Sequence, residues 1–329
     1  MFAGAWMSVL WLREWLFTGF PWNPIANIML PYPVVSNSMS VFGALGLTFI
    51  IVGLVATVVQ MLCNRRNWVL RWVFLFFVLL LGIGILGGYN NIKLSGLGDD
   101  SGVVRIVQPA TTQQKKISLS RVDALNQAKN RVQSLIDLAG DVSNVDLVVY
   151  PETSYPFVLL RNDVLPIAEK LNKRVIIGSN VYDAGNVYNS LVVSGADGSI
   201  FDIYDKSHLV PFGEYGPIKF VPAPANLTAG DGATVISIDG SAGRNFVFAP
   251  AVCYEIIFSD AVVKQSGVDA IINITNDTWF GKTPGTYQHL DMVRRAAIES
   301  GVPVIRANYS GISAFIGADG AIISQLPIG

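Results

Sequence analysis

Cys253 is the residue of this sequence best placed to do chemistry. It follows the apolar run Phe246–Val252, and Tyr254 and Glu255 come directly after it. A thiol at the end of a strand, beside a carboxylate, is typical of a nucleophile, because the thiolate is the reactive form of cysteine. The alternative is a small buried hydrophobic residue, a role that free cysteines often have.

Two further motifs supply the charges that a nucleophilic thiol needs. Glu152 ends the string Tyr-Pro-Glu, and Lys206 ends the string Tyr-Asp-Lys, each after a strand-like run. A free thiol is mostly protonated at neutral pH, so it needs a base or a nearby cation to react. Glu152 could accept that proton and return it to a leaving group, and Lys206 could stabilise the oxyanion of a tetrahedral intermediate. Taken singly, each also fits a solvated strand end or a surface charge.

The composition argues against several other functions. The 329 residues carry a formal net charge of −1, which gives no electrostatic basis for binding nucleic acid. The two cysteines, Cys63 and Cys253, lie in different parts of the chain, so a disulfide is not expected. No Cys/His cluster has zinc-binding spacing, and a Ser-His-Asp triad would have to use His208 or His289. We therefore expect no metal site.

Residues 1–88 are strongly apolar and predict a membrane region. The segments 41–63 and 68–88 are each long enough to cross a bilayer core of about 30 Å. Residues 1–20 are a third candidate span, although two charged residues interrupt them. The region is therefore expected to hold two or three transmembrane helices.

The charges between these segments predict how the chain lies in the membrane. Arg65 and Arg66 form a basic turn between the two long apolar segments, and such turns favour the cytoplasm. The chain then leaves the membrane on the other side. Residues 89–102 are polar and rich in Gly, Ser, Asn and Asp, which is typical of a linker. Residues 103–329 are expected to form an extracytoplasmic domain.

Strand-like and helical patterns alternate through residues 103–329, which predicts an α/β layered fold. Asp-Gly turns predict hairpins, and hairpins indicate a mixed sheet. Active residues of open α/β sheets gather at the carboxyl ends of strands, so Glu152, Lys206 and Cys253 are expected to converge. The predicted strands cover residues 103–107, 145–150, 174–178, 188–193, 199–203, 246–252, 270–274, 302–306, 311–316 and 321–324, and the predicted helices residues 118–139, 163–171 and 286–300.

Four strings, in a fixed order, carry a resemblance to a known family. They are Pro151-Glu152, the run Asp-Lys-Ser-His-Leu-Val-Pro-Phe-Gly-Glu at 205–214, Cys253-Tyr-Glu, and Asn-Asp-Thr-Trp-Phe-Gly at 276–281. They resemble the carbon–nitrogen hydrolase (nitrilase) superfamily, and most closely its membrane branch, the apolipoprotein N-acyltransferases. The resemblance covers the soluble half and extends into the membrane half through residues 14–22.

The resemblance implies a nitrilase-like four-layer αββα sandwich preceded by transmembrane helices. It also implies a Glu-Lys-Cys triad, with Glu152 as general base, Lys206 as oxyanion-stabilising lysine and Cys253 as nucleophile. The accessory or substrate-binding residues that it implies are Asn189, Glu214, Tyr254, Glu255, Trp279 and Phe280.

Some of these accessory residues keep an alternative. Trp279 and Phe280 suit an apolar lid over an acyl chain beside a glycine hinge, or simply a core. Asn189 fits a site residue or a hydrogen bond at the start of a strand. His208, within the second string, is expected to order a loop.

The family reaction is a two-step acyl transfer that needs no metal and no redox cofactor. The thiol of Cys253 would take an acyl group from a membrane phospholipid, giving a thioester and a lysophospholipid. The N-terminal amine of the diacylglyceryl-cysteine of an apolipoprotein would then accept it. The partners implied are a phospholipid donor, an apolipoprotein acceptor and the membrane. The location implied is the bacterial inner membrane, with several spans and the catalytic domain on the periplasmic side.

Two other functions stay open. The chain could be a membrane-tethered nitrilase-type amidase acting on a small amide, or an inactive truncated remnant. Family members have more spanning helices than this sequence offers, including one after the catalytic domain. The sequence therefore looks like a shortened form or a fragment.

Overall fold

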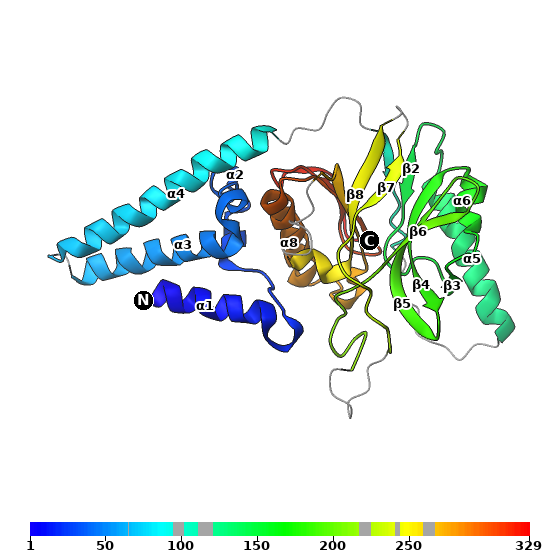
Figure 1. Ribbon diagram of the computed structural model, residues 1–329, viewed down its shortest axis with the longest axis horizontal. Coiled ribbons are helices and arrows are strands. Elements are labelled where there is room, and N and C mark those ends of the chain that lie inside the picture. The colour runs from blue at the N-terminus through cyan, green and yellow to red at the C-terminus, as the bar shows by residue number, and fades with distance from the viewer. Residues whose placement is uncertain (65, 95–101, 111–120, 217–224, 241–243, 259–266) are drawn as a thin grey trace.

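Two six-stranded sheets lie face to face in the second half of the chain, with helices on their outer faces (Figure 1). The computed structural model describes residues 1–64, 66–94, 102–110, 121–216, 225–240, 244–258 and 267–329. Apolar side chains from both sheets interdigitate in one buried layer, with Val149 and Ile176 on one side and Phe248 and Ile272 on the other. We call residues 103–329 the sandwich domain.

The first sheet has the strand order β1-β2-β4-β5-β6, with β3 beside β4. Its strands are β1 (Val104–Ile106), β2 (Leu147–Val149), β3 (Leu159–Leu160), β4 (Arg174–Asp183), β5 (Asn186–Ser194) and β6 (Ile200–Asp205). The pairs β1–β2 and β2–β4 are parallel, whereas β4, β5 and β6 form two hairpins. Ala184 and Gly185 both have positive φ in the two-residue β4–β5 turn, the conformation that matches strand twist. The predicted mixed sheet is confirmed.

The second sheet has the order β12-β11-β10-β9-β8-β7. Its strands are β7 (Ile236–Asp239), β8 (Asn245–Val252), β9 (Ala270–Thr275), β10 (Val304–Asn308), β11 (Ser313–Ile316) and β12 (Ile322–Leu326). The three central strands β8, β9 and β10 are parallel and almost wholly buried, which explains their continuous apolar runs. The sequence patterns missed β3 and β7, because each is too short to show a clear period.

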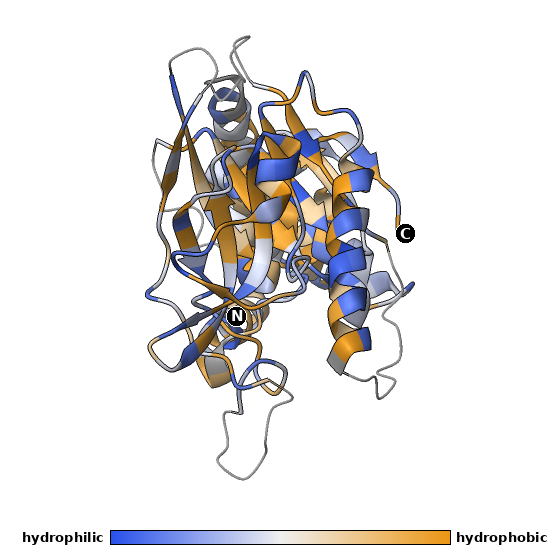
Figure 2. Ribbon diagram, turned by 90° about the vertical axis from the view of Figure 1, so that its right-hand side faces the viewer, coloured by the Kyte–Doolittle hydropathy of each residue, from blue (hydrophilic) through white to orange (hydrophobic). Residues whose placement is uncertain are grey.

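Helices complete the four layers. On the outer face of the first sheet lie α5 (Arg121–Ala139) and α6 (Pro166–Leu171), and on that of the second lies α8 (Pro284–Ser300). Figure 2 views the α5 side and shows hydrophilic residues on the outward surface of this helix with apolar strands behind it. α6 begins three residues later than predicted, at a proline, which suits the first turn of a helix. The first residues of the predicted helix 118–139 lie outside the described residues. The predicted αββα sandwich is confirmed.

The amino-terminal half consists of helices that project from the sandwich domain (Figure 1). They are α1 (Phe2–Trp15), α2 (Pro33–Ser36), α3 (Met39–Cys63) and α4 (Trp68–Leu94), with short 3-10 helices at η1 (Leu16–Thr18) and η2 (Ile25–Met29). Among the described residues, two helical segments are long and apolar enough to cross a membrane, Met39–Cys63 and Trp68–Asn91. α1 has 14 residues. At 1.5 Å per residue it is about 21 Å long, which is shorter than a bilayer core of about 30 Å. A third span at residues 1–20 therefore stays a prediction.

Helix α4 extends into the predicted linker. It continues to Leu94, so residues 89–94 are helical. These residues include no proline, and adding residues to an existing helix is easier than starting one. The remainder of the linker up to residue 101 lies outside the described residues.

The two halves meet on α8. Ile298 of α8 is buried in a cluster with Ala26, Leu30, Met39 and Leu47 from the helical half. The indole nitrogen of Trp22 also donates to Gln288 Oε1 at 2.8 Å. The outer face of this sandwich helix is therefore covered by the apolar amino-terminal half.

Candidate active site

Cys253 lies at the turn between β8 and the short 3-10 helix η3 (Cys253–Ile257). Its φ of 58° is in the left-handed region, which residues other than glycine rarely adopt. Two side chains brace this turn. The carboxylate of Glu255 accepts from the Val252 amide at 2.8 Å, and Asn273 Nδ2 donates to the Cys253 carbonyl at 3.2 Å. Such strained positions persist where the surroundings fix them, often at functional sites.

Glu152 and Lys206 lie beside Cys253, as the strand-end argument expects. Lys206 Nζ is 3.7 Å from Glu152 Oε1 and 2.8 Å from Glu214 Oε1, and the lysine side chain is fully buried. Glu152 and Lys206 are the two charged groups that act most strongly on the Cys253 thiol. Gly178 of β4 allows this packing, because a Cβ there would lie 2.4 Å from the Glu152 Cα. The structure thus brings the three predicted catalytic residues together, while their roles stay predictions.

The three groups perturb one another's ionisation. Burial raises the pKa of Glu152, and the opposing effect of Lys206 does not cancel it. Burial and the Glu152 charge also raise the pKa of the Cys253 thiol. Burial disfavours the Lys206 ammonium, but Cys253, Glu152 and Glu214 outweigh it and raise the lysine pKa. At neutral pH these shifts favour an ammonium on Lys206 and a protonated thiol on Cys253.

Asn189 and Glu214 hold the base and the lysine in place. Asn189 Nδ2 donates to Glu152 Oε1 at 2.7 Å and to Glu214 Oε1 at 2.9 Å. The other oxygen of Glu214 accepts from the Val210 amide at 2.7 Å. Asn189 therefore does more than pair with backbone at a strand start, because its amide joins two site carboxylates.

The Glu255 carboxylate hydrogen-bonds Tyr204 and the residues that follow Lys206. Its Oε1 accepts hydrogen bonds from the Tyr204 hydroxyl at 3.0 Å and from the amides of Ser207 and His208 at 2.8 and 3.0 Å. These bonds tie the segment after Lys206 to the Cys253 turn. The geometry gives this residue a positioning function within the site.

Aromatic rings lie beside Lys206 and along the segment that follows it. Tyr254 donates its hydroxyl to the Leu209 carbonyl at 2.7 Å, and its ring lies 5.4 Å from Lys206 Nζ. The ring of His208 stacks on Phe258 at 3.8 Å between centroids, which suits the loop-ordering role expected of it.

Trp279 and Phe280 differ in their surroundings. The side chain of Trp279 is 76% exposed, so the core alternative does not apply to it. Phe280 lies 5.5 Å from the Trp22 ring, which stacks in turn on Phe20. An aromatic cluster from both halves of the chain therefore lies next to the exposed indole, and the lid role stays a prediction.

Comparison with known proteins agrees with this geometry. The carbon-nitrogen hydrolase family model matches residues 104–328, and the model of the apolipoprotein N-acyltransferase N-terminal domain matches residues 1–58. The chain belongs to the carbon–nitrogen hydrolase family.

Relatives in this family carry the name apolipoprotein N-acyltransferase. One from Rhizobium rhizogenes is 36% identical over 96% of this chain and 63% of its own length. Another from Brucella melitensis is 31% identical over 99% of this chain and 64% of its own length. The chain thus spans less than two thirds of these curated relatives. The crystal structure of Saccharomyces cerevisiae Nit3, a nitrilase-superfamily member, has a TM-score of 0.51 at 18% identity, covering 69% of this chain and 86% of that one. That likeness concerns the fold alone.

Behind the site of this carbon–nitrogen hydrolase lies a buried polar network that sequence reasoning missed. Arg306, fully buried on β10, donates to Asn273 Oδ1 at 2.5 Å and to Asp277 Oδ2 at 2.8 Å. His289 Nδ1 is 2.8 Å from Asp277 Oδ1. Burial opposes the Asp277 charge, but His289 and Arg306 outweigh it and lower the aspartate pKa. The network ends on the Cys253 carbonyl through Asn273.

Polar residues within a strand-like segment of the sequence could have indicated this network. An arginine and an asparagine interrupt the otherwise apolar segment Val304–Asn308, and a charge inside a buried strand needs a partner. In the part of the chain that the structure describes, no group of three or more His, Cys, Asp or Glu side chains could hold a metal ion.

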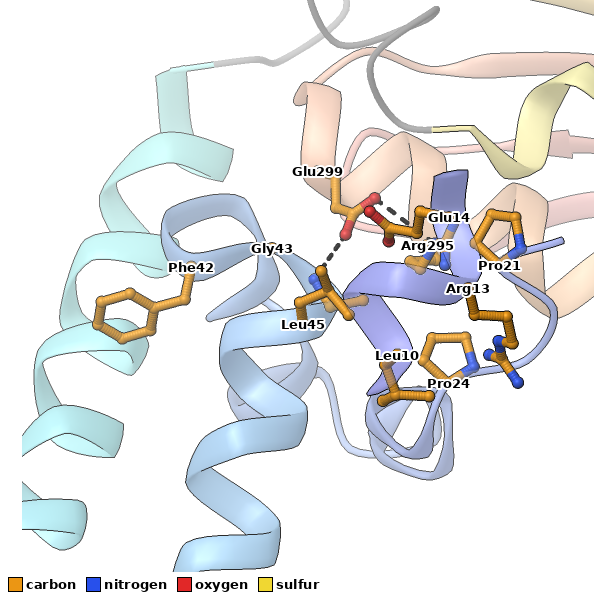
Figure 3. Close-up of a pocket in the computed structure, with 11 residues that line it drawn as sticks. Leu10, Arg13, Glu14, Pro21, Pro24, Phe42, Gly43, Leu45, Arg295 and Glu299 are labelled. Atoms are coloured by element: carbon orange, nitrogen blue, oxygen red, sulfur yellow. Dashed lines mark hydrogen bonds and ion pairs between the residues drawn. The ribbon is translucent and has the colours of Figure 1, made fainter. Parts of the chain in front are cut away.

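A separate pocket of about 210 Å³ lies between the two halves, away from Cys253 (Figure 3). It is lined by α1, by α3 around Gly43 and by two charged residues of α8, Arg295 and Glu299. Glu299 contacts the break in α3, and Arg295 contacts the end of η3.

Proposed function

We propose that this chain forms the catalytic domain and adjoining membrane helices of an apolipoprotein N-acyltransferase. It would move a fatty acyl group from a membrane phospholipid, through a thioester on Cys253, to the N-terminal amine of the diacylglyceryl-cysteine of an apolipoprotein. The observation that carries the proposal is the Glu152–Lys206–Cys253 cluster on a domain whose α8 packs against α3, one of two long, apolar, lipid-compatible helices. The names of its relatives support the same reaction.

The proposed location follows from the same features. Residues 1–88 would form the membrane region, 89–102 the connection and 103–329 the catalytic domain. The basic turn between α3 and α4 would lie in the cytoplasm, which leaves the sandwich domain on the periplasmic side of the bacterial inner membrane.

The first half-reaction uses each group of the triad. The Cys253 thiol passes its proton to Glu152 as sulfur attacks the ester carbonyl carbon. The carbonyl oxygen gains negative charge, which the Lys206 ammonium stabilises in a buried, weakly screened site. Glu152 returns the proton to the departing lysophospholipid oxygen as the carbon–oxygen bond breaks. A thioester on Cys253 remains.

The second half-reaction runs through the same groups. The neutral amine of the apolipoprotein attacks the thioester carbon, and Glu152 accepts a proton from the nitrogen. The tetrahedral intermediate then collapses with release of the Cys253 sulfur, which takes the proton from Glu152. The products are an amide on the apolipoprotein and a free thiol.

Mass spectrometry of the thiol tests the proposal. The chain, reconstituted in phospholipid nanodiscs, should gain the mass of one acyl group on the peptide that contains Cys253. The adduct should be absent in Cys253→Ala and should disappear when a diacylglyceryl-cysteine peptide is added. Ammonia release from small amides without any phospholipid-dependent adduct would instead identify a tethered amidase. Absence of both activities would identify an inactive remnant.

A further inference from the structure

Helix α3 is broken near its start. Gly43 has φ 65° and ψ 174°, a conformation that glycine adopts far more readily than other residues. The residues that follow such a break begin a new helical segment, whose first amides have no carbonyl partner within the helix. Ala44 is the first of them and is buried, so its amide needs another acceptor.

A carboxylate of the sandwich domain supplies that acceptor. Glu299, in the last turn of α8, accepts a hydrogen bond from the Ala44 amide at 2.6 Å through Oε1 (Figure 3). The side chain of Glu299 is only 7% exposed. A buried carboxylate at the start of a helix is favoured by the helix dipole and by the charge-assisted hydrogen bond.

The same carboxylate is linked to the end of the Cys253 segment through Arg295. Arg295 precedes Glu299 by one turn of α8, and its Nε lies 3.5 Å from Glu299 Oε2. The guanidinium also donates to the carbonyl of Ile257, the last residue of η3, which begins at Cys253. One turn of α8 thus contacts the break in α3 and the end of the nucleophile segment.

We infer that Glu299 and Arg295 are positioning residues that fix membrane helix α3 and the Cys253 segment in one relative position. The inference rests on the proposed function only where acylation is the measurement. An acyl ester held in the membrane must meet the thiol at bonding distance, and misplacement by about 1 Å can slow a reaction about 100-fold. Both contacts are to backbone groups, so each depends on the presence of these two side chains.

Hydrogen exchange tests the α3 contact without reference to activity. In nanodiscs, Glu299→Leu should speed exchange at the amides of residues 44–47 by about tenfold, because one charge-assisted hydrogen bond is lost. Glu299→Gln keeps an acceptor oxygen and should show a smaller change. Asp291→Asn, which removes a carboxylate from the same helix, is the matched control and should exchange as the parent does. Unchanged exchange in Glu299→Leu, or an equal change in the control, overturns the inference.

Single-turnover acylation tests the link to Cys253. The rate constant for thioester formation at saturating phospholipid should fall about tenfold in Glu299→Leu and in Arg295→Met. The amplitude, which counts folded protein, should stay near that of the parent, and so should the phospholipid concentration that gives half the maximal rate. If Glu299→Leu does not fold, Glu299→Gln takes its place with an intermediate rate expected. A fall in amplitude at an unchanged rate constant contradicts a positioning role. If the parent forms no thioester, the proposed function fails, and the exchange measurement still decides the contact.

Discussion

At the scale of residues, the site depends on the burial of charges that neutralise one another. Lys206 carries an ammonium with no exposure to solvent, and two carboxylates, Glu152 and Glu214, balance it. An unpaired charge in this position would be strongly destabilising. The same burial raises the Glu152 pKa toward the range in which a carboxylate is an effective base.

The raised pKa of Glu152 predicts where activity is lost on acidification. Glu152 must be ionised to accept the thiol proton, so thioester formation should fall as the pH drops through its folded pKa. That acidic limb should lie above the ordinary value of 4.5. Asn189→Ala removes a hydrogen bond that favours the ionised form, so it should move the limb to still higher pH. The check is the pH profile of single-turnover acylation, and a limb at the ordinary carboxyl value in both proteins would count against Glu152 as the base.

At the scale of elements, the parallel strands β8, β9 and β10 bring Cys253, the proposed nucleophile, together with the side chains that hold its turn. Cys253 follows β8, Asn273 lies on β9, and Arg306 lies on β10. Parallel registration aligns these strand ends, so the arginine reaches the asparagine and the asparagine reaches the cysteine carbonyl. The left-handed conformation of Cys253 is thereby held from the neighbouring strand.

Removing the asparagine amide tests this arrangement. Asn273→Ala should lower the acylation rate constant by about tenfold, because the Cys253 turn loses its brace. It should also lower stability by about 1–3 kcal/mol, since Arg306 loses a buried acceptor. The measurements are single-turnover acylation and thermal unfolding. Ser237→Ala, on the exposed face of β7, is the control and should change neither. A normal acylation rate in Asn273→Ala would show that the Cys253 turn keeps its conformation without the Asn273 hydrogen bond.

At the scale of the whole molecule, the sandwich domain is fixed to an apolar hairpin through α8. The hairpin exposes large apolar side chains along its length, including Leu62, Trp72 and Phe76. In water such a surface would associate or aggregate, whereas lipid would cover it. With the hairpin in a membrane, as proposed, the position of α8 between the hairpin and Cys253 would place the chemistry close to the membrane surface.

The native thiol of Cys63 reports the orientation of the hairpin. Cys63 is exposed beside the basic turn, which should face the cytoplasm. A thiol reagent that cannot cross membranes should therefore leave Cys63 unlabelled in spheroplasts with an intact inner membrane and label it after permeabilisation. A cysteine introduced by Ser237→Cys, in the sandwich domain, should be labelled in both conditions. The reverse pattern would place the sandwich domain in the cytoplasm.

The sequence by itself determined the layers of this protein and the three charged or nucleophilic residues that meet in it. Glu152, Lys206 and Cys253 each follow an apolar strand pattern, and those local patterns are sufficient to predict both the alternating elements and the edge where the three residues meet. The patterns did not reveal that α4 continues into residues 89–94, because a helix end depends on how far the helix propagates, and they missed β3 and β7, which are too short to show a period.

Only the tertiary structure decided which side chains hold the nucleophile in place. Asn273 reaches the Cys253 carbonyl from a neighbouring strand, and Glu299 reaches an amide that lies 255 positions earlier in the sequence. A periodic pattern reports which face of an element is buried, but a specific hydrogen bond requires two groups to meet at about 3 Å. That meeting depends on how β9 and α8 pack, which no local pattern encodes.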